Sequence, residues 1–408
     1  MSLTVRILLA LVAGMLSGLA LSEWGGQFGT RIVAIARPVG KAWLNGLQMP
    51  LIPLIFGLLV TGIASAAVSA RTGGVAARAI LYFAIALTAS AALAGVLGQA
   101  LLAWWPVPAG AVQALSFAGG GSDVEGVRPS AEWLLGFIPV NPIRSAADGQ
   151  VVAVVVFALL FGFAAVRIDE ARRTQLLGLV DAMVETLLVV VGWVLRLAPV
   201  GVFALGLVAS AQSGLATAGT LLHYIAFIVT ICIVVTLCVY PAAIVLGRVA
   251  PSRFVRAALP SQLIAFSTQS SIASLPAMIE ASDGPLEIRP EVRSIVLPLA
   301  ISLFRITSPP ANLAVALYIA ALHGVALGPA QIMLGVAVAT IVSLAAVGLP
   351  SQITFFTTTG PICLAMGVPV EALPLLLAVE TVPDIFRTVG NVTADLAMTR
   401  ILNRRVAA

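Results

Sequence analysis

The sequence predicts an all-helical protein that crosses a membrane several times, and two observations support this prediction. The first is composition: the 408-residue chain is 60% hydrophobic and only 10% charged, with a mean hydropathy of +1.08, unlike any soluble globular protein. The second is the recurrence of apolar runs of about 18 residues or more, each long enough to span about 30 Å of hydrocarbon. The protein is therefore expected to contact the lipid bilayer along most of its length.

The first half of the chain contains simple apolar runs. We expect spans near residues 4–22, 43–68, 76–104, 150–166, 176–210 and 219–247. The first run follows Arg6 and could imitate a signal peptide, but the many later spans favour an uncleaved first helix. A polar, glycine-rich segment, residues 118–129, interrupts the connection between the third and fourth spans, and we expect it to be an external loop.

The net charge of +5 does not indicate nucleic-acid binding, because the basic residues lie mainly in short connections. If these connections are cytoplasmic, both termini lie inside, since cytoplasmic loops are enriched in Lys and Arg. Arg31, Arg37 and Lys41 break the pattern and would lie outside or at the interface. The basic residues that fit the pattern are Arg71, Arg78, Arg167, Arg172, Arg173, Arg248, Arg253, Arg256, Arg289, Arg293, Arg400, Arg404 and Arg405.

Cysteines and histidines exclude several kinds of site. The three cysteines, Cys232, Cys238 and Cys363, all lie within apolar runs, and we expect them to be buried small hydrophobic residues. The two histidines, His223 and His323, stand alone near the ends of spans. Neither pattern has the spacing of a disulfide framework or a metal site, and no Ser-His-Asp triad is supported. We therefore expect no catalytic residues, no metal and no cofactor.

Two late apolar segments are interrupted. Residues 261–276 are apolar but rich in hydroxyl groups, and residues 341–360 contain the break Gly348-Leu-Pro350. Non-helical backbone at membrane depth is tolerated only where protein or a water-filled cavity surrounds it. Either segment alone could be a kinked helix, but a pair of Gly/Pro-interrupted segments is typical of the binding site of a transporter.

Arg305 is a charge inside the apolar run of residues 298–320. Pro309-Pro310 follows it closely and should break the helix, because proline lacks an N–H and its ring clashes with the preceding turn. Arg305 would then share one depth with the polar residues of the last apolar stretch. The alternative is that Arg305 snorkels to the surface or pairs structurally with Asp395 or Glu380.

The last apolar stretch, Leu373 to Ile401, contains six polar residues on what would be one helix face. Each charge near the centre of a membrane helix costs about 2.5–3.5 kcal/mol on insertion scales, so such charges pair, meet water or bind a ligand. The stripe could be an ion-pair network that fixes helix packing, or a ligand site inside the membrane. Its members are Glu380, Asp384, Arg387, Thr388, Asn391 and Asp395.

At this point the chain resembles the dicarboxylate/amino acid:cation symporters, the family that includes the excitatory glutamate transporters. The segment Asp384–Asp395, DIFRTVGNVTAD, is similar to the D-x-x-R-T-x-x-N-V-x-x-D of that family. Further similarities are Pro139-Val-Asn-Pro142, the serine-rich residues 270–276 and Val347-Gly-Leu-Pro350. The resemblance covers nearly the whole chain.

The resemblance implies a glutamate-transporter-like fold of eight transmembrane helices and two re-entrant helical hairpins, assembled as a homotrimer. Scaffold helices one and two would occupy residues 1–75, and scaffold helices four and five residues 111–215. Helix three (76–110) and residues 216–408 would form a mobile unit that moves as an elevator. The hairpins would lie at about 257–288 and 329–365, with tips near Ser270–Ser274 and Gly348–Gln352.

The resemblance also implies the roles of individual residues. Arg387 corresponds to the arginine that binds the side-chain carboxylate of the substrate, which suits the planar fork of a guanidinium. Asp384 corresponds to the residue that binds the substrate amino group. Thr388, Asn391 and Ser271 correspond to further substrate contacts of the family. We expect the remaining contacts to come from Ser270, Arg305, Ser308, Gly348 and Pro350. Asp395 corresponds to a cation-site carboxylate, and we expect Glu380 and Asn391 to share in holding the coupling cation or proton.

The chain departs from the family where sodium is bound. The family's Asn-Met-Asp-Gly-Thr corresponds here to Phe304–Ser308, so Phe304 and Ile306 replace two sodium ligands and Arg305 replaces the methionine. The third helix near Ala86-Leu87 also lacks the expected hydroxyl groups. Our hypothesis is that Arg305 supplies as a fixed charge what sodium supplies in relatives. Transport would then be coupled to protons, or uncoupled, with a buried carboxylate as the proton carrier.

The expected function is therefore secondary active transport of aspartate or glutamate across a bacterial inner membrane. The alternatives are a carrier of C4-dicarboxylates or other amino acids, a sodium-coupled symporter with a rearranged site, and a scaffold that has lost transport. A channel would need a short symmetric filter of carbonyls or charges, and none is visible. An enzyme would need a nucleophile–base pair or metal ligands.

Overall fold

The computed structural model describes residues 3–71, 74–108, 138–345 and 351–407. Within these ranges the chain is built of helices and turns and contains no strand. The helices of the first half are α1 (Leu3–Trp24), α2 (Gly26–Gln48), α3 (Leu51–Arg71), α4 (Gly74–Trp104), α7 (Pro142–Ala147), α8 (Val151–Ala165), α9 (Glu170–Arg196) and α10 (Ala198–Ser213).

The second half continues in the same way. Its helices are α11 (Ala216–Val245), α12 (Pro251–Thr268), α13 (Leu275–Asp283), α14 (Pro290–Leu303), α15 (Ser308–Leu322), α16 (Pro329–Ala345), α17 (Ser351–Ala365), α18 (Leu373–Val379) and α19 (Thr381–Ala407). Among the described residues, six helical segments are long and apolar enough to cross a membrane. The protein is thus a multi-pass helical membrane protein, as the composition predicted. The glycine-rich segment at 118–129, expected as an external loop, lies outside the described residues.

Two of the expected spans are each divided into two helices. The span expected at 43–68 is interrupted at Met49–Pro50, between α2 and α3, and the span expected at 176–210 is interrupted at Leu197, between α9 and α10. A proline lies at each interruption, Pro50 and Pro199, and removes one donor from the helical hydrogen-bond ladder. These two expected spans are therefore not single continuous helices.

Helix α2 was not predicted, because Arg31, Arg37 and Lys41 made its sequence look like a polar connection. The three charged residues are exposed, whereas Trp43 and other apolar residues of α2 are buried. The indole N–H of Trp43 donates to the carbonyl of Val194 at 3.0 Å, which fixes α2 against α9. The helix is amphipathic and lies along the surface of the bundle, so its charges need not enter the apolar interior.

Helices α1 and α10 pack unusually closely because of two glycines spaced four residues apart. A Cβ added at Gly14 would lie 2.4 Å from the backbone oxygen of Phe203, and one at Gly18 would lie 2.3 Å from the backbone oxygen of Leu207. Small residues at this spacing let two membrane helices approach until their backbones touch. The Gly14–Gly18 pair therefore sets the distance between α1 and α10.

Replacing Gly18 with valine is expected to lower the thermal unfolding midpoint of the detergent-solubilised protein. The new methyl groups would meet backbone atoms of α10, which cannot rotate away as a side chain can, and overpacking of this kind costs about 1–3 kcal/mol. Gly192→Val is the matched control, because nothing lies within 4 Å of a Cβ at Gly192 in α9. Equal midpoints for the two variants would contradict this account of the α1–α10 contact.

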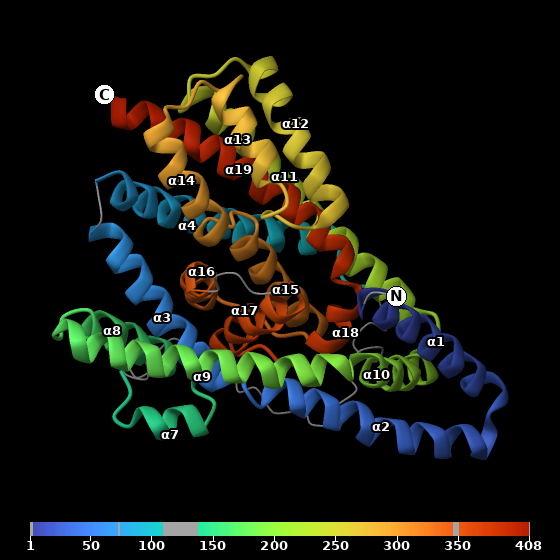
Figure 1. Ribbon diagram of the computed structural model, residues 1–408. Helices are drawn as coiled ribbons and strands as arrows, with labels where there is room; N and C mark the ends of the chain where they lie inside the picture. The colour runs from blue at the N-terminus through green and yellow to red at the C-terminus, as the bar shows by residue number, and fades with distance from the viewer. Residues whose placement is uncertain (1–2, 72–73, 109–137, 346–350, 408) are drawn as a thin grey trace.

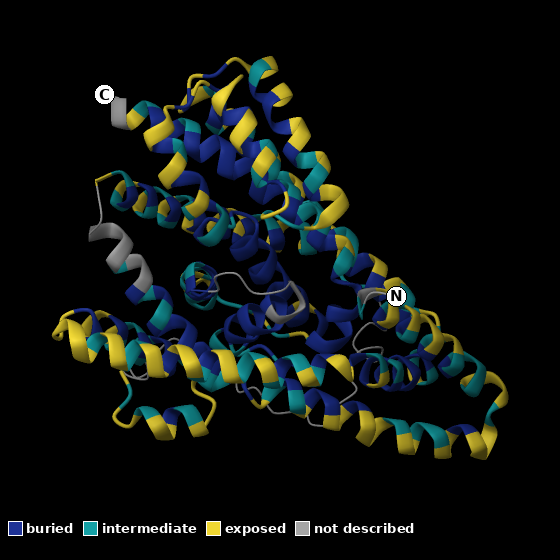
Figure 2. Cartoon of the chain, in the orientation of Figure 1, coloured by how far each residue is buried: buried dark blue, intermediate teal, exposed yellow. Residues whose placement is uncertain are grey.

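The helices fall into two sets that meet around a buried centre. Helices α1, α2, α9 and α10 lie along one side of the molecule, and α12, α13, α14 and α19 lie on the other (Figure 1). Helices α15, α17 and α18 lie between them and are almost entirely buried, whereas α2 and α9 expose one face along their length (Figure 2). Two pairs of consecutive helices, α12 with α13 and α16 with α17, pack against each other.

Candidate functional site

The chain leaves the helical conformation at residues 304–307, between α14 and α15. Pro309 and Pro310 occupy the first turn of α15, where a missing N–H is tolerated, and they prevent α14 from continuing. The predicted helix break next to Arg305 is thus confirmed, and Arg305 lies inside it, partly buried.

Side chains from α4 and α19 hydrogen-bond to the backbone freed by this break. The Ser90 hydroxyl, from α4, donates to the carbonyl of Ile306 at 3.0 Å. The Thr307 N–H donates to Asn391 Oδ1 at 3.0 Å, and the Thr307 hydroxyl donates to the carbonyl of Arg387 at 2.8 Å. Non-helical backbone at membrane depth requires such partners. The break and the start of α19 are consequently one connected unit.

The polar stripe of the last apolar stretch is buried. The exposed fractions of Glu380, Asp384, Arg387, Thr388, Asn391 and Asp395 are all 7% or less. The expectation that all six lie on one helix was wrong, because the chain breaks at Glu380 between α18 and α19. Pro383 explains the break, since it cannot donate to the carbonyl four residues earlier. The other five residues of the stripe lie on α19.

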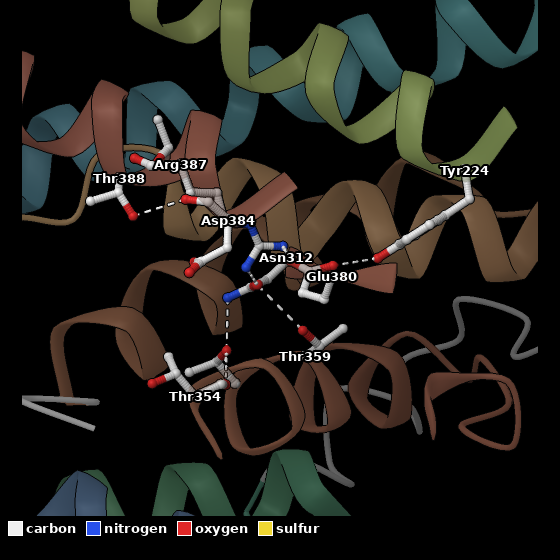
Figure 3. A network of polar contacts seen from close by, with 10 residues as sticks. Tyr224, Asn312, Thr354, Thr359, Glu380, Asp384, Arg387 and Thr388 are labelled. Atoms are coloured by element: carbon white, nitrogen blue, oxygen red, sulfur yellow. Dashed lines mark hydrogen bonds and ion pairs between the residues drawn. The ribbon is translucent and has the colours of Figure 1, made fainter. Parts of the chain in front are cut away.

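Arg387 and Glu380 form a buried ion pair. Arg387 Nη2 lies 2.8 Å from one carboxylate oxygen of Glu380, and the hydroxyl of Tyr224, from α11, donates to the other oxygen at 2.8 Å. Both charged side chains are less than 10% exposed. Figure 3 shows Tyr224 reaching across from α11 to Glu380. The pair is therefore held by two segments that are far apart in the sequence, α11 and the junction of α18 with α19.

Asn312 joins the same guanidinium to α17. Arg387 Nη1 donates to Asn312 Oδ1 at 3.1 Å, and the Asn312 amide donates to the hydroxyl of Thr358 at 2.8 Å. The hydroxyl of Thr359 donates to Asn312 Oδ1 at 3.3 Å. In Figure 3 Asn312 lies between Arg387 and the threonines of α17. Helix α17 is thus connected to Arg387 through the amide side chain of Asn312.

Arg305 is within electrostatic range of Asp384 and Asp395. With Arg387 and Glu380, these residues form a cluster of two guanidinium groups and three carboxylates. If all five groups are ionised, their formal charges sum to −1, because two positive charges oppose three negative ones. A further negative charge in this cluster would be costly unless a cation or proton accompanied it.

The positions where the sequence departs from the sodium-binding pattern meet around an apolar pocket of about 240 Å³. Ala86, Phe304 and Ile306 all line it, and the phenyl rings of Phe304 and Phe83 stack with centroids 4.7 Å apart. Ser90 also lines the pocket, but its hydroxyl is already hydrogen-bonded to backbone carbonyls. Cys238 lies at the exposed rim of the pocket, so it was wrong to expect all three cysteines to be buried.

The remaining predicted substrate contacts that the structure describes lie on three different parts of the chain. Ser270 and Ser271 lie in the turn between α12 and α13, where the Ser270 hydroxyl accepts from the N–H of Ala273 at 3.2 Å. Ser308 is buried at the start of α15, and the Thr388 hydroxyl donates to the carbonyl of Asp384 at 2.8 Å. Gly348 and Pro350 lie outside the described residues.

Sequence reasoning missed several members of the site. They are Tyr224, Thr307, Asn312, Thr358 and Thr359. One of them carried a usable signal: Asn312 is a lone amide in a long apolar run, and a polar residue inside a membrane span is by default a functional candidate. The others are hydroxyl-bearing residues, which occur widely in apolar helices.

The arrangement suits the binding of an anion. Arg387 is buried, and its Nε has no hydrogen-bond partner among the described residues. A guanidinium presents its N–H groups in a planar fork that matches a carboxylate, and such charge-assisted hydrogen bonds are strong in a dry environment. A second carboxylate one turn earlier on the same helix, Asp384, could hold a cationic group of the same ligand.

Comparison with known proteins identifies the family of the chain. The family described as "Sodium:dicarboxylate symporter family" matches residues 3–405. The chain is 27% identical over 403 residues to the proton/glutamate-aspartate symporter of Escherichia coli, covering 97% of this chain and 90% of that protein. It is 27% identical to a C4-dicarboxylate transport protein of Deinococcus radiodurans, covering 98% and 89% of the two chains.

A third relative is the proton/sodium-glutamate symport protein of Bacillus subtilis, to which the chain is 25% identical over 410 residues, covering 98% of this chain and 92% of that protein. The family match spans almost all of the chain and all these relatives are named as transporters rather than enzymes. The protein belongs to the sodium:dicarboxylate symporter family.

Proposed function

We infer that this protein is a proton-coupled symporter of acidic amino acids, aspartate or glutamate, in a bacterial inner membrane. The observation that supports this most directly is the buried guanidinium of Arg387, with the carboxylate of Asp384 one helical turn away. An acidic amino acid has both a carboxylate for Arg387 and an amino group for Asp384. Two of the relatives are themselves named for glutamate, in agreement with this substrate class.

Coupling to sodium is disfavoured by the chemistry around the helix break. Sodium needs several oxygen ligands, and Phe304 and Ile306 present carbon to an apolar pocket at the positions in question. Arg305 lies between them in the chain and is within electrostatic range of Asp384 and Asp395. In our proposal its fixed positive charge takes the place of a bound sodium ion. In this proposal Asp395 orients Arg305, and Asn391 holds the backbone of the helix break through Thr307.

The charge of the cluster favours coupling to protons. If all five groups are ionised they already sum to −1, and a bound aspartate or glutamate would add a further net negative charge. Excess charge in a membrane interior is strongly disfavoured, so an anionic substrate should enter together with a positive charge. A proton on one of the buried carboxylates provides that charge without needing a ligand cage.

The transport movement that we propose follows the division of the chain expected from the family. Residues 1–75 and 111–215 would form the scaffold of a homotrimer, with both termini cytoplasmic. Residues 76–110 and 216–408 would move as an elevator, with the helix pairs α12–α13 and α16–α17 as re-entrant hairpins on the two sides of the site. Ser270, Ser271, Ser308, Thr388, Gly348 and Pro350 would complete the substrate contacts.

The second candidate substrate is a C4-dicarboxylate, since several relatives are C4-dicarboxylate transport proteins. Such a substrate has a carboxylate for Arg387 but no amino group that Asp384 could bind. Measuring how well succinate competes with labelled aspartate for uptake distinguishes the two candidate substrates.

Uptake of radiolabelled aspartate or glutamate into proteoliposomes, with pH and sodium gradients imposed independently, tests the proposal. We expect a pH gradient, acidic outside, to drive accumulation without sodium, and a sodium gradient alone to drive none. An inward gradient of one pH unit corresponds to about tenfold accumulation for one proton per substrate. Strict dependence on sodium would show the coupling assignment to be wrong.

A further inference from the structure

Arg387 already binds a carboxylate of the protein. Its Nη2 lies 2.8 Å from Glu380, its Nη1 donates to Asn312, and its Nε is without a hydrogen-bond partner among the described residues (Figure 3). The Nε–Nη2 edge of a guanidinium is one of the edges at which a carboxylate binds through two parallel hydrogen bonds. Glu380 and a substrate carboxylate at this edge would share the single positive charge of Arg387, so we expect binding of the substrate to displace Glu380.

Glu380 keeps only a neutral partner after such a displacement. The hydroxyl of Tyr224 donates to the second carboxylate oxygen at 2.8 Å and does not depend on Arg387. The Glu380 side chain is 4% exposed, so water does not replace the lost guanidinium in this conformation.

The other titratable groups on the elements packed around Glu380 do not supply a second cation. Helix α10 has no titratable residue, and the charged residues of α1, Arg6 and Glu23, are exposed. Arg305 acts on Asp384 and Asp395 instead. The remaining groups near Glu380 include His223, Tyr224 and Cys232 on α11, Tyr318 on α15, Cys363 on α17 and Asp384 on α19. The His223 ring nitrogen Nδ1 lies 3.1 Å from the Tyr318 hydroxyl, so His223 is paired with Tyr318 rather than with Glu380.

A buried carboxylate without a counter-charge is strongly disfavoured, and it is neutralised most simply by binding a proton. We propose that Glu380 carries the coupling proton. When the substrate carboxylate binds Arg387, Glu380 loses its contact with the guanidinium and binds a proton instead. The proton binds a Glu380 oxygen from the compartment that supplies the substrate. When the substrate leaves, Arg387 returns to Glu380 and the proton departs to the other compartment. One guanidinium shared by two carboxylates thus couples one proton to each substrate.

This assignment rests on the proposed function, because it requires a substrate carboxylate at Arg387. The test uses the full-length Glu380→Gln variant in proteoliposomes. Glutamine keeps the size of the side chain and an acceptor for Tyr224 but cannot take up a proton. We expect exchange of internal for external aspartate to persist, and the roughly tenfold accumulation driven by one pH unit to be lost. Glu371→Gln, which removes a glutamate outside this cluster, should accumulate aspartate like the wild type.

The outcomes distinguish failure of Glu380 as the proton carrier from failure of proton coupling itself. Accumulation by Glu380→Gln equal to that of the wild type would overturn Glu380 as the carrier while leaving proton coupling intact. Absence of pH-driven accumulation in the wild type would overturn proton coupling itself, and this assignment with it.

A second measurement on the wild-type protein covers the case in which Glu380→Gln does not fold. Infrared difference spectra with and without aspartate should show a carboxyl group that becomes protonated on substrate binding. Carbon-13 labelling of glutamate, but not of aspartate, in the protein should shift this band. A band that shifts only with labelled aspartate residues would place the proton on Asp384 or Asp395 and overturn the proposal.

Discussion

Arg387→Ala is expected to abolish binding of aspartate and glutamate. A hydrogen bond to a charged group contributes about 1.5–3 kcal/mol, so losing the two bonds of a bidentate contact should weaken binding at least about 100-fold. The same change leaves the Glu380 carboxylate buried without its counter-charge, and breaking a buried pair in this way costs about 3–5 kcal/mol of folding stability. Two effects, on the ligand and on the fold, therefore coincide in this variant.

The double variant Arg387→Ala/Glu380→Gln separates these effects. Because neither group is charged, much of the lost folding stability should return, while binding should remain absent. Thermal unfolding with and without aspartate measures both quantities, since a ligand that binds the folded state raises the unfolding midpoint. Arg256→Ala, which removes an exposed arginine, is the control for the loss of a positive charge. Normal stabilisation of the double variant by aspartate would contradict the role given to Arg387.

Sequence reasoning succeeded where the cause is local. The break beside Arg305 follows from Pro309 and Pro310, and the burial of the stripe on α19 follows from the spacing of Asp384, Arg387 and Asn391 in an apolar background. Prolines and intramembrane charges act through the chain immediately around them, so their consequences can be read from one segment. Breaks at Pro50, Pro199 and Pro383 follow from the same rule, although the sequence analysis did not apply it there.

The contacts that define the site are not local. Tyr224 is 156 residues from Glu380, and Asn312 is 75 residues from Arg387. Which tyrosine faces which carboxylate depends on the rotation and depth of packed helices, and periodicity within one helix does not determine these. The sequence left Arg305 with two candidate partners, Asp395 and Glu380. The structure instead pairs Glu380 with Arg387 and leaves Arg305 near Asp384 and Asp395.

Arg305→Met is expected to reduce aspartate uptake at least about tenfold, which corresponds to 1.4 kcal/mol. Removing this guanidinium changes the formal charge of the cluster from −1 to −2 and leaves Asp395, which is 1% exposed, without a nearby positive charge. At a separation of about 4 Å and an effective dielectric constant of about 20, one such interaction is worth about 4 kcal/mol. Uptake into proteoliposomes under a fixed pH gradient measures the effect.

Arg305→Lys distinguishes a requirement for charge from a requirement for shape. If Arg305 replaces a bound cation, the point charge of lysine should preserve most of the uptake, because the interaction with Asp384 and Asp395 does not need a planar fork. If Arg305→Lys lost as much uptake as Arg305→Met, the guanidinium would instead be needed to hold the helix break in a specific geometry. Uptake by Arg305→Met at the wild-type rate would instead mean that the aspartates are neutral without it, and that the charge at 305 has no part in transport.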